Sequence, residues 1–289
     1  MKIGSTGLGE HFVIPLLRGC GQLFFQPSAL TGSVFLLLIL AQSTASFVMC
    51  AAGVLGSTLC AYSLEHPRND YYQGLGGFNG GLVGLALSVF YQFSGMLLVI
   101  AFVAGVLTGV VRVLLVKMLA FPPFTTPFIS VAWLVFLGGD WLGIRTMEPP
   151  VIEAWQIYGL TTNASQVLFL LHPWIGALVF AAVLLHSRIA ALWVAAASLV
   201  AWLAALAFVM PEEPIAAGLL GYNGLILAAA LQHRDTPVLL AAAGVVLSVW
   251  LTYLLLTAGI TPLSAPFVLS AWMVIAVETI LARRRLAPR

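Results

Sequence analysis

The chain has 289 residues, of which 61% are hydrophobic and only 8% are charged, and its formal net charge is +2. Soluble proteins carry roughly 25% charged residues, so this composition excludes a water-soluble globule and indicates lipid as the solvent. The sequence has no basic stripe with interleaved aromatic residues, so nothing in it indicates a nucleic-acid partner.

Several stretches are long enough to cross all or part of a bilayer and are almost free of charge, among them 30–40, 96–107 and 239–256. In hydrocarbon every backbone N–H and C=O needs an internal partner, which leaves helix bundles and closed barrels. Continuous apolar runs favour helices over alternating strands. The sequence therefore predicts an all-α integral membrane protein in a lipid bilayer.

The N-terminal segment MKIGSTGLGEHFVIP has no basic stretch followed by an apolar run and a cleavage site, so a cleaved signal peptide is not expected.

Residues 1–140 form the first predicted repeat, with about five transmembrane helices and one re-entrant helix near 78–92. The motif GLGGFNGGLVGLAL opens an apolar stretch of about a dozen residues, which is too short to span a core of roughly 30 Å. FPPFTTPF then breaks the chain, because proline has no N–H and favours the first turn of a helix.

A polar linker is predicted at 141–160, followed by a second repeat at 161–289 with five transmembrane helices and a re-entrant helix near 222–232. Three motifs of the first half recur here in the same order. Gln22 pairs with Gln166 and Asn79 with Asn223, both at an offset of 144 residues, and Pro127 pairs with Pro266 at an offset of 139. This is internal homology. An odd number of crossings per half makes the second copy inverted, and inverted repeats place solute sites near the bilayer midplane.

The C-terminal segment RRRLAPR clusters arginines beside the last helix, which predicts a cytoplasmic C-terminus. With an even number of crossings, Lys2 and the N-terminus are expected on the same side.

Cys20, Cys50 and Cys60 show no metal-type spacing and are expected to be small packing residues. The sequence thus predicts no metal site and no cofactor.

The motifs RGCGQLFFQ, GLGGFNGGLVG and PPFTTPF, with their second copies GYNGLIL and PLSAPF, resemble the signatures of the urea transporter family over about 17–272. The resemblance implies a passive urea channel in the bacterial inner (plasma) membrane. It also implies a homotrimer in which each protomer has its own pore, formed where two inverted halves meet.

Position by position, the resemblance implies a substrate pathway with three kinds of lining residue. Those at one mouth are Gln22, Phe25, Gln166 and Val167. The aromatic positions toward the other mouth are Phe78 and Tyr222, and the constriction is formed by Leu82, Ile226, Thr125 and Ser264. Asn79, Asn223, Pro127 and Pro266 are expected to be structural at the helix breaks, with the two asparagines capping the re-entrant helices. The sequence departs from the family at Ser264, Ile226, Ser28 and His172, where threonine, leucine and, at the last two positions, asparagine are usual.

These residue types suit urea, which is flat and neutral, with several N–H donors and one carbonyl acceptor. Removing its water without replacement costs several kcal/mol. The oxygens of Gln22, Gln166, Thr125 and Ser264, together with carbonyls released at the helix breaks, are expected to replace that water. Apolar walls are expected to hold the flat faces. None of the pathway positions is charged, so an ion would lose its hydration without a counter-charge.

Three other functions remain open on the sequence. An ammonia or ammonium channel needs facing histidines, and only His172 and His186 lie in membrane-like stretches. An ion-coupled transporter needs a carboxylate within the membrane, whereas Glu212 and Glu213 lie in a proline-flanked loop and Glu278 near the last helix end. An enzyme is not expected, since there is no nucleophile paired with a base, no H-E-x-x-H motif and no phosphate loop.

Overall fold

The computed structural model describes residues 9–64, 68–147 and 155–286. No strand occurs within these ranges; the one β-type contact is an isolated bridge between Tyr91 and Thr146. The all-helical expectation is therefore confirmed. Lys2, part of the linker (148–154) and the last residues of the C-terminal arginine cluster lie outside the described residues.

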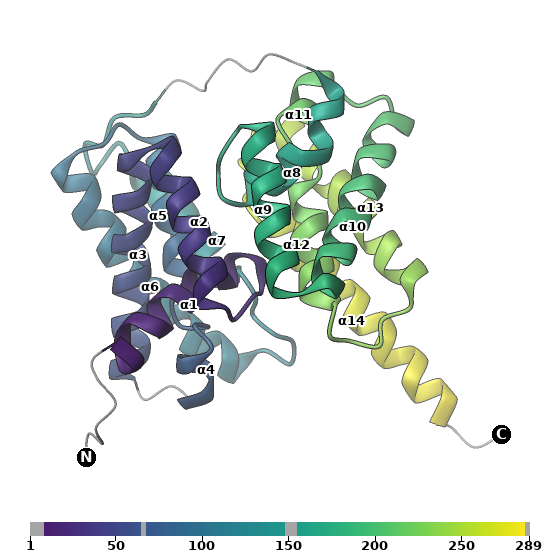
Figure 1. The fold of residues 1–289 in the computed structure, drawn as a ribbon, viewed down its shortest axis with the longest axis horizontal. Helices are drawn as coiled ribbons and strands as arrows, with labels where there is room; N and C mark the ends of the chain where they lie inside the picture. Colours follow the sequence, from purple (N-terminus) through teal and green to yellow (C-terminus); the bar gives the residue numbers. More distant parts are fainter. Residues whose placement is uncertain (1–8, 65–67, 148–154, 287–289) are drawn as a thin grey trace. The chain divides into compact units, whose positions relative to one another are not determined.

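The chain forms two compact units (Figure 1). The first comprises 1–119, 123–151 and the short segment 168–170. It begins with the π-helix η1 (Gly9–Val13) and contains the 3-10 helix η2 (Gln22–Phe24). Its α-helices are α1 (Ile14–Gly21), α2 (Ala29–Gln42), α3 (Thr44–Ser63), α4 (Arg68–Tyr72), α5 (Phe78–Phe90), α6 (Gly95–Met118) and α7 (Thr126–Gly138). Helix α3 packs along both α5 and α6.

The second unit comprises 120–122, 152–167 and 171–289. It contains the 3-10 helix η3 (Gln156–Tyr158). Its α-helices are α8 (Gly159–Val167), α9 (Pro173–His186), α10 (Arg188–Ala207), α11 (Glu212–Ala216), α12 (Tyr222–Leu231), α13 (Val238–Thr257) and α14 (Ala265–Leu286). Helix α12 packs against α8, α10, α13 and α14.

The order of helices in the first unit recurs in the second, from α1–α7 to α8–α14. The backbone recurs too, because residues with positive φ fall at repeat-related positions. Phe25 and Phe169 have φ of 54° and 57°, Gly74 and Gly218 have φ of 79° and 74°, and Phe124 and Leu263 have φ of 46° and 45°. The internal homology of the sequence is thus accompanied by a recurrence of local structure. The inverted orientation of the copies stays a prediction.

Within the described part of the chain, five helices are long and apolar enough to cross a membrane: α3, α6, α10, α13 and α14. A sixth span results if 11–24 and 29–42, which meet at a bend of 75°, count together. The sequence predicts about ten crossings, so the long spans are fewer than expected. The difference arises because much of the apolar sequence forms shorter helices, namely α5, α7, α9 and α12. Two of these occur where re-entrant helices are predicted, and that role stays a prediction.

Two repeat-related glycines explain how the first helices of each unit pack. A Cβ on Gly32 would lie 1.8 Å from the carbonyl oxygen of Leu17, and a Cβ on Gly176 would lie 1.9 Å from that of Thr161. No side chain fits such a gap, so only glycine lets α2 approach α1, and α9 approach α8, this closely. The two glycines, at repeat-related positions, therefore reflect one packing arrangement built twice.

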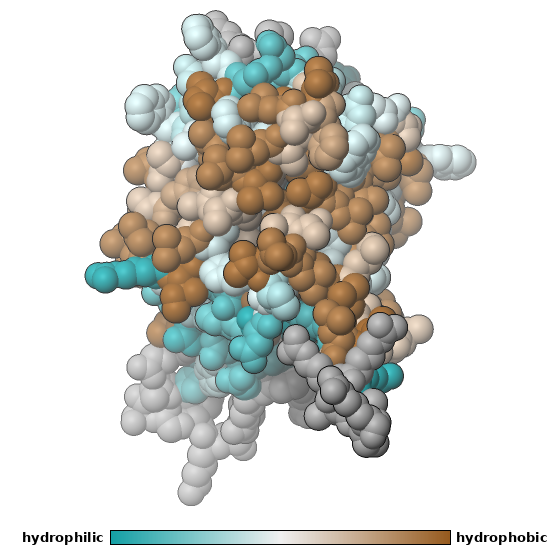
Figure 2. Space-filling view, turned by 90° about the vertical axis from the view of Figure 1, so that its right-hand side faces the viewer, coloured by the Kyte–Doolittle hydropathy of each residue, from teal (hydrophilic) through white to brown (hydrophobic). Residues whose placement is uncertain are grey.

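The exposed surface is strongly apolar. Leu137, Leu185 and Leu239 are 82%, 74% and 85% exposed, and many other large apolar side chains on the long helices are also exposed. Figure 2 shows one face on which hydrophobic residues cover the middle and hydrophilic residues gather toward the two ends. An apolar surface of this extent is typical of a protein in contact with lipid. The structure therefore supports the prediction of a multi-pass membrane protein.

Candidate functional site

Three aromatic rings from separate elements of the first unit lie close together. The ring of Phe25, which follows η2, lies 6.2 Å from that of Phe78, the first residue of α5. It lies 6.1 Å, edge-on, from the ring of Phe124, which precedes α7. Two of these residues are predicted pathway positions, and the structure brings them together. Phe124 was not predicted, although its place at a helix break was a signal for it.

The backbone of Phe25 is strained, since a bulky residue rarely has positive φ. Such conformations cost on the order of 1–3 kcal/mol and cluster at functional sites. Phe169, the repeat partner of Phe25, has the same conformation, and its ring lies 6.3 Å from that of Phe128 within the first unit. The site prediction omits Phe169, although the offset of 144 residues pointed to it.

The other predicted positions of the first unit flank these rings. Leu82 lies one turn after Phe78 on the same face of α5. Thr125 is the N-cap residue of α7 and directly follows Phe124. The side chains of Phe78, Leu82 and Thr125 are all buried, at 3%, 5% and 3% exposed. An aromatic ring, an aliphatic side chain and a hydroxyl thus lie at the start of α5 and α7.

The second unit carries a corresponding set. Tyr222 is the first residue of α12, and Ile226 lies one turn later on the same face. The Tyr222 hydroxyl donates a hydrogen bond to the carbonyl of Leu263, which is directly followed by Ser264. The predicted residues Tyr222, Ile226 and Ser264 are all buried. The hydrogen bond fixes the Tyr222 ring against the segment that carries the serine hydroxyl.

The two predicted glutamines differ in their bonding. Gln22 Nε2 donates to the carbonyl of Gln73 at 2.8 Å. Gln166 lies near the end of α8, followed by the buried Val167, and its Oε1 has no hydrogen-bond partner within the described residues. A buried acceptor without a donor costs about 1–3 kcal/mol, and in native structures such an atom requires a reason. Gln166 Oε1 is therefore suited to accept a hydrogen bond from a solute.

Asn79 and Asn223 link two helices in each unit. Asn79 Nδ2 donates to the carbonyl of Phe124 at 3.3 Å, while the N–H of Phe128 donates to Asn79 Oδ1 at 3.3 Å. Asn223 bonds in the same way to Leu263 and Phe267, both at 3.2 Å. We call these two arrangements the asparagine clamps.

The clamps correct one expectation from the sequence. Asn79 and Asn223 were expected to cap the re-entrant helices, but these helices have Gly77 and Gly221 as N-cap residues, without a side-chain cap. Instead, Asn79 accepts a hydrogen bond from an N–H in the first turn of α7, and Asn223 accepts one from an N–H in the first turn of α14. The reason is that Asn79 and Asn223 already lie within the first turn of α5 and α12. Pro127 and Pro266 lie in the first turns of α7 and α14, as expected of structural residues.

The backbone turn before α5 is held by side chains. Carbonyls of four residues there accept hydrogen bonds: Arg18 donates to Tyr72, Gln22 to Gln73, Arg112 to Leu75 and Ser57 to Gly76. We call residues 72–77 the clamped turn. Arg112 also forms an ion pair with Asp70 at 3.0 Å.

Several carbonyls at the helix breaks, which were expected to face a solute, already accept hydrogen bonds inside the protein. The carbonyl of Leu263 accepts from both Tyr222 and Asn223, which uses its two lone pairs. The carbonyl of Phe124 accepts from Asn79, and those of the clamped turn are engaged as well. Internal donors reach these carbonyls because each break packs against a neighbouring helix. The carbonyl of Leu263 is thus fully engaged, and that role for the other break carbonyls stays a prediction.

Two departures from the family pattern are explained by helix capping. Ser28 is the N-cap residue of α2, and its hydroxyl accepts from the N–H of Thr31 at 3.2 Å. His172 is the N-cap residue of α9, and its Nδ1 accepts from the N–H of Trp174 at 3.3 Å. Asparagine, serine and histidine all supply an acceptor at this position, so the substitutions retain the cap.

One titratable group lies beside the clamped turn. Burial, reinforced by Tyr62 and Tyr72, raises the pKa of Tyr71 to about 12. Tyr71 therefore stays neutral at physiological pH and keeps its hydroxyl proton. That hydroxyl donates to the carbonyl of His11 at 2.9 Å, which attaches η1 to α4.

None of the predicted pathway residues is itself charged, although Arg18 and Arg112 donate to the same clamped turn as Gln22. His172 and His186 are exposed at the two ends of α9. Among carboxylates with described side chains, Asp70 and Glu278 are the least exposed, and both are in ion pairs, with Arg112 and Arg234. Cys20, Cys50 and Cys60 are free and buried, as expected of packing residues.

Comparison with known proteins agrees with these features. The family model described as "Urea transporter" matches residues 13–279. Urea transporter 1 of Ovis aries is 24% identical over 304 residues, which cover 93% of this chain and 78% of that protein. Urea transporter 1 of Mus musculus is 27% identical over 240 residues, covering 74% and 61%. The chain belongs to the urea transporter family, and it is a transport protein rather than an enzyme.

Proposed function

We propose that this chain is a passive, selective pathway that conducts urea down its concentration gradient. The observation that carries the proposal is the recurrence of one buried set of residues at matched helix breaks. Each unit provides an aromatic ring, an aliphatic side chain one turn later and a hydroxyl, without a charged side chain among them. Together with the family membership, this recurrence favours two contributions to a single pathway.

The chemistry of the two sets suits urea. Its N–H groups need acceptors, and Gln166 Oε1 is a buried acceptor without a donor among the described residues. The hydroxyls of Thr125 and Ser264 add two oxygens at matched positions, and Gln22 adds a second amide. Phe25, Phe78 and Tyr222 offer flat apolar faces, while Leu82, Val167 and Ile226 limit the width. Several weak sites in sequence favour rapid passage over tight binding.

The alternatives lack a comparable observation. Facing histidines for an ammonia pore would have to come from His172 and His186, which are exposed and separated by the length of α9. An ion-coupled transporter would place an ionisable carboxylate at the site. Asp70 is instead in an ion pair with Arg112, and neither residue belongs to the predicted pathway. A passive pathway for a neutral solute fits the uncharged positions best.

The proposal includes the wider arrangement. We propose that the two units are inverted copies in a bacterial inner membrane, with both termini cytoplasmic. We also propose that three protomers associate, each with its own pathway. The matched motifs support the inversion, because equivalent helix breaks would then supply equivalent residues to one solute.

The test replaces both hydroxyls with a residue of similar shape. Purified protein in liposomes is exposed to a urea gradient, and stopped-flow light scattering records the volume change. Each substitution, Thr125→Val and Ser264→Ala, should lower urea flux about fivefold, since one lost hydrogen bond is worth about 1 kcal/mol. The control is His186→Gln, at an exposed residue at the end of α9, which should leave the flux unchanged. Unaltered flux in the double variant Thr125→Val/Ser264→Ala would refute the assigned pathway.

A further inference from the structure

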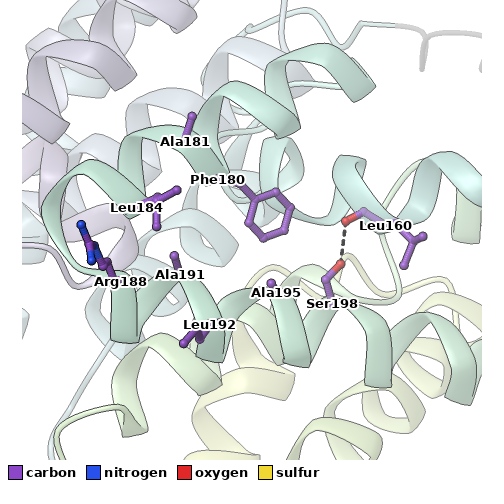
Figure 3. A pocket seen from close by; sticks show the side chains of 9 residues that line it. All are labelled: Leu160, Phe180, Ala181, Leu184, Arg188, Ala191, Leu192, Ala195 and Ser198. Atoms are coloured by element: carbon purple, nitrogen blue, oxygen red, sulfur yellow. Dashed lines mark hydrogen bonds between the residues drawn. The ribbon is translucent and has the colours of Figure 1, made fainter.

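An apolar groove lies within the second unit, away from the predicted pathway residues (Figure 3). It has a volume of about 720 Å³. Its apolar walls are formed by α8, α9 and α10, through Leu160, Phe180, Leu184, Ala191, Leu192 and Ala195. We call it the α9–α10 groove. Small side chains on α10 create the hollow, and the ring of Phe180 points toward it.

The two ends of the groove differ in chemistry. At one end the Ser198 hydroxyl donates to the carbonyl of Leu160 at 2.7 Å and accepts from Asn163 at 3.1 Å. This polar group is therefore already satisfied and requires no polar ligand. At the other end lies Arg188, the first residue of α10, which is exposed and forms no ion pair with any described residue. The groove thus has an apolar interior and a single cationic end.

The N-terminus of α10 adds to the positive charge at that end. Ser187 caps the helix through its hydroxyl, which accepts from the N–H of Ala190 at 3.1 Å. The start of a 20-residue helix carries a partial positive charge and favours an anionic group. Arg188 and the helix dipole therefore act together, and both favour a phosphate.

The dimensions of the groove match a lipid chain. Arg188 and Ser198 are ten residues apart on one helix, which corresponds to roughly 15 Å at 1.5 Å per residue. That is about half of a hydrocarbon core of roughly 30 Å, the depth of one leaflet. The volume divided by this length gives a mean cross-section of roughly 50 Å², less than the roughly 80 Å² of a helix that is about 10 Å across with its side chains. A chain fits where a helix of a second copy does not.

We propose that the α9–α10 groove binds one phospholipid with an anionic headgroup. One acyl chain lies along Ala191 and Ala195, and the phosphate lies at Arg188. Each Arg near an anionic lipid contributes about 1 kcal/mol, so a headgroup preference of about fivefold is expected. The apolar chain supplies most of the remaining affinity, since each buried CH₂ contributes about 0.8 kcal/mol.

Native mass spectrometry of the purified full chain in detergent tests this site. Phosphatidylglycerol and phosphatidylcholine with identical acyl chains are titrated, and the lipid-bound fraction is measured. The wild type should prefer phosphatidylglycerol about fivefold, and Arg188→Gln should abolish that preference. Lys117→Gln removes another exposed cation, at the end of α6 and outside the groove, and should retain it. Ala195→Phe fills the groove and should weaken binding of both lipids.

Equal binding of the two lipids by the wild type would overturn the proposal, as would an unchanged preference in Arg188→Gln. If Ala195→Phe instead dissociates an oligomer while lipid binding stays constant, the groove is covered by a second copy, and the proposal fails. The readout is lipid binding, so it does not depend on urea flux. Failure of this site therefore leaves the proposed urea pathway untouched.

Discussion

Single atoms distinguish a solute-facing residue from a packing residue. Gln166 and Gln232 are both buried, and both have an Oε1 without a partner among the described residues. Only Gln166 belongs to the predicted pathway. Gln232 donates through Nε2 to the carbonyl of Ala229 at 2.9 Å, within its own region of the chain. The two glutamines therefore form a matched pair for testing whether an unpaired acceptor serves transport.

We predict that Gln166→Leu lowers urea flux about fivefold and leaves the thermal unfolding temperature unchanged or higher. The flux falls because a solute acceptor worth about 1 kcal/mol is lost, and stability is maintained because a buried unsatisfied group is removed. Gln232→Leu should likewise have an unfolding temperature equal to or above that of the wild type, but its urea flux should be normal. Stopped-flow flux and thermal melts of both variants provide the comparison. A normal flux in Gln166→Leu would show that its oxygen faces no solute.

Much at the residue scale follows from the sequence, and some does not. The offset of 144 residues pairs Gln22 with Gln166 without any structure. The positive φ of Phe25 could not be predicted, since a phenylalanine carries no preference for that conformation. The bond from Gln22 to Gln73 joins residues 51 apart in the chain, and only tertiary packing creates it.

At the scale of elements, the asparagine clamps join α5 to α7 and α12 to α14. Their location at helix breaks was predicted from the sequence, but the helix that they satisfy was not. The partners of Asn79 lie 45 and 49 residues further along the chain, beyond any local pattern. The sequence also did not predict which apolar segments form long helices and which form the shorter helices α5, α7, α9 and α12, because apolar composition predicts burial in lipid but not helix length.

We predict that Asn79→Ala and Asn223→Ala each destabilise the protein by about 2 kcal/mol. Each loses the two hydrogen bonds of its clamp, worth about 1 kcal/mol apiece. Asn223→Ala also loses the bond to the Thr252 hydroxyl, so its loss should be the larger. Thermal unfolding in detergent measures the effect, with the exposed Asn69→Ala on α4 as control. Two variants that melt like the control would mean that the clamps contribute nothing to the helix breaks.

The clamped turn gives a second prediction at this scale. Arg112→Met removes the ion pair to Asp70 and the bond to the carbonyl of Leu75, and should cost about 2 kcal/mol. This is below the 3–5 kcal/mol typical of a fully buried pair, because Asp70 is 33% exposed. Adding Asp70→Asn should recover part of the loss, as measured in a double-mutant cycle of unfolding free energies. Strict additivity of the two substitutions would show that the pair is not coupled.

At the scale of the whole molecule, composition and repetition were the strongest signals in the sequence. Few charges and long apolar runs predicted a helical membrane protein, and the structure agrees with its apolar surface and long helices. The matched motifs predicted a duplicated architecture, and the order of helices recurs. Inversion, a trimer and cytoplasmic termini remain predictions, since they concern orientation and partners rather than the local structure of one chain.

The central claim is that urea crosses passively. The most direct measurement is the initial rate of urea flux in proteoliposomes, with Na⁺ and H⁺ gradients either collapsed by ionophores or imposed in either direction. We predict one rate under all these conditions, proportional to the urea gradient and reversing with it, because no charged side chain is among the pathway positions. Accumulation of urea against its gradient when an ion gradient is imposed would contradict the account.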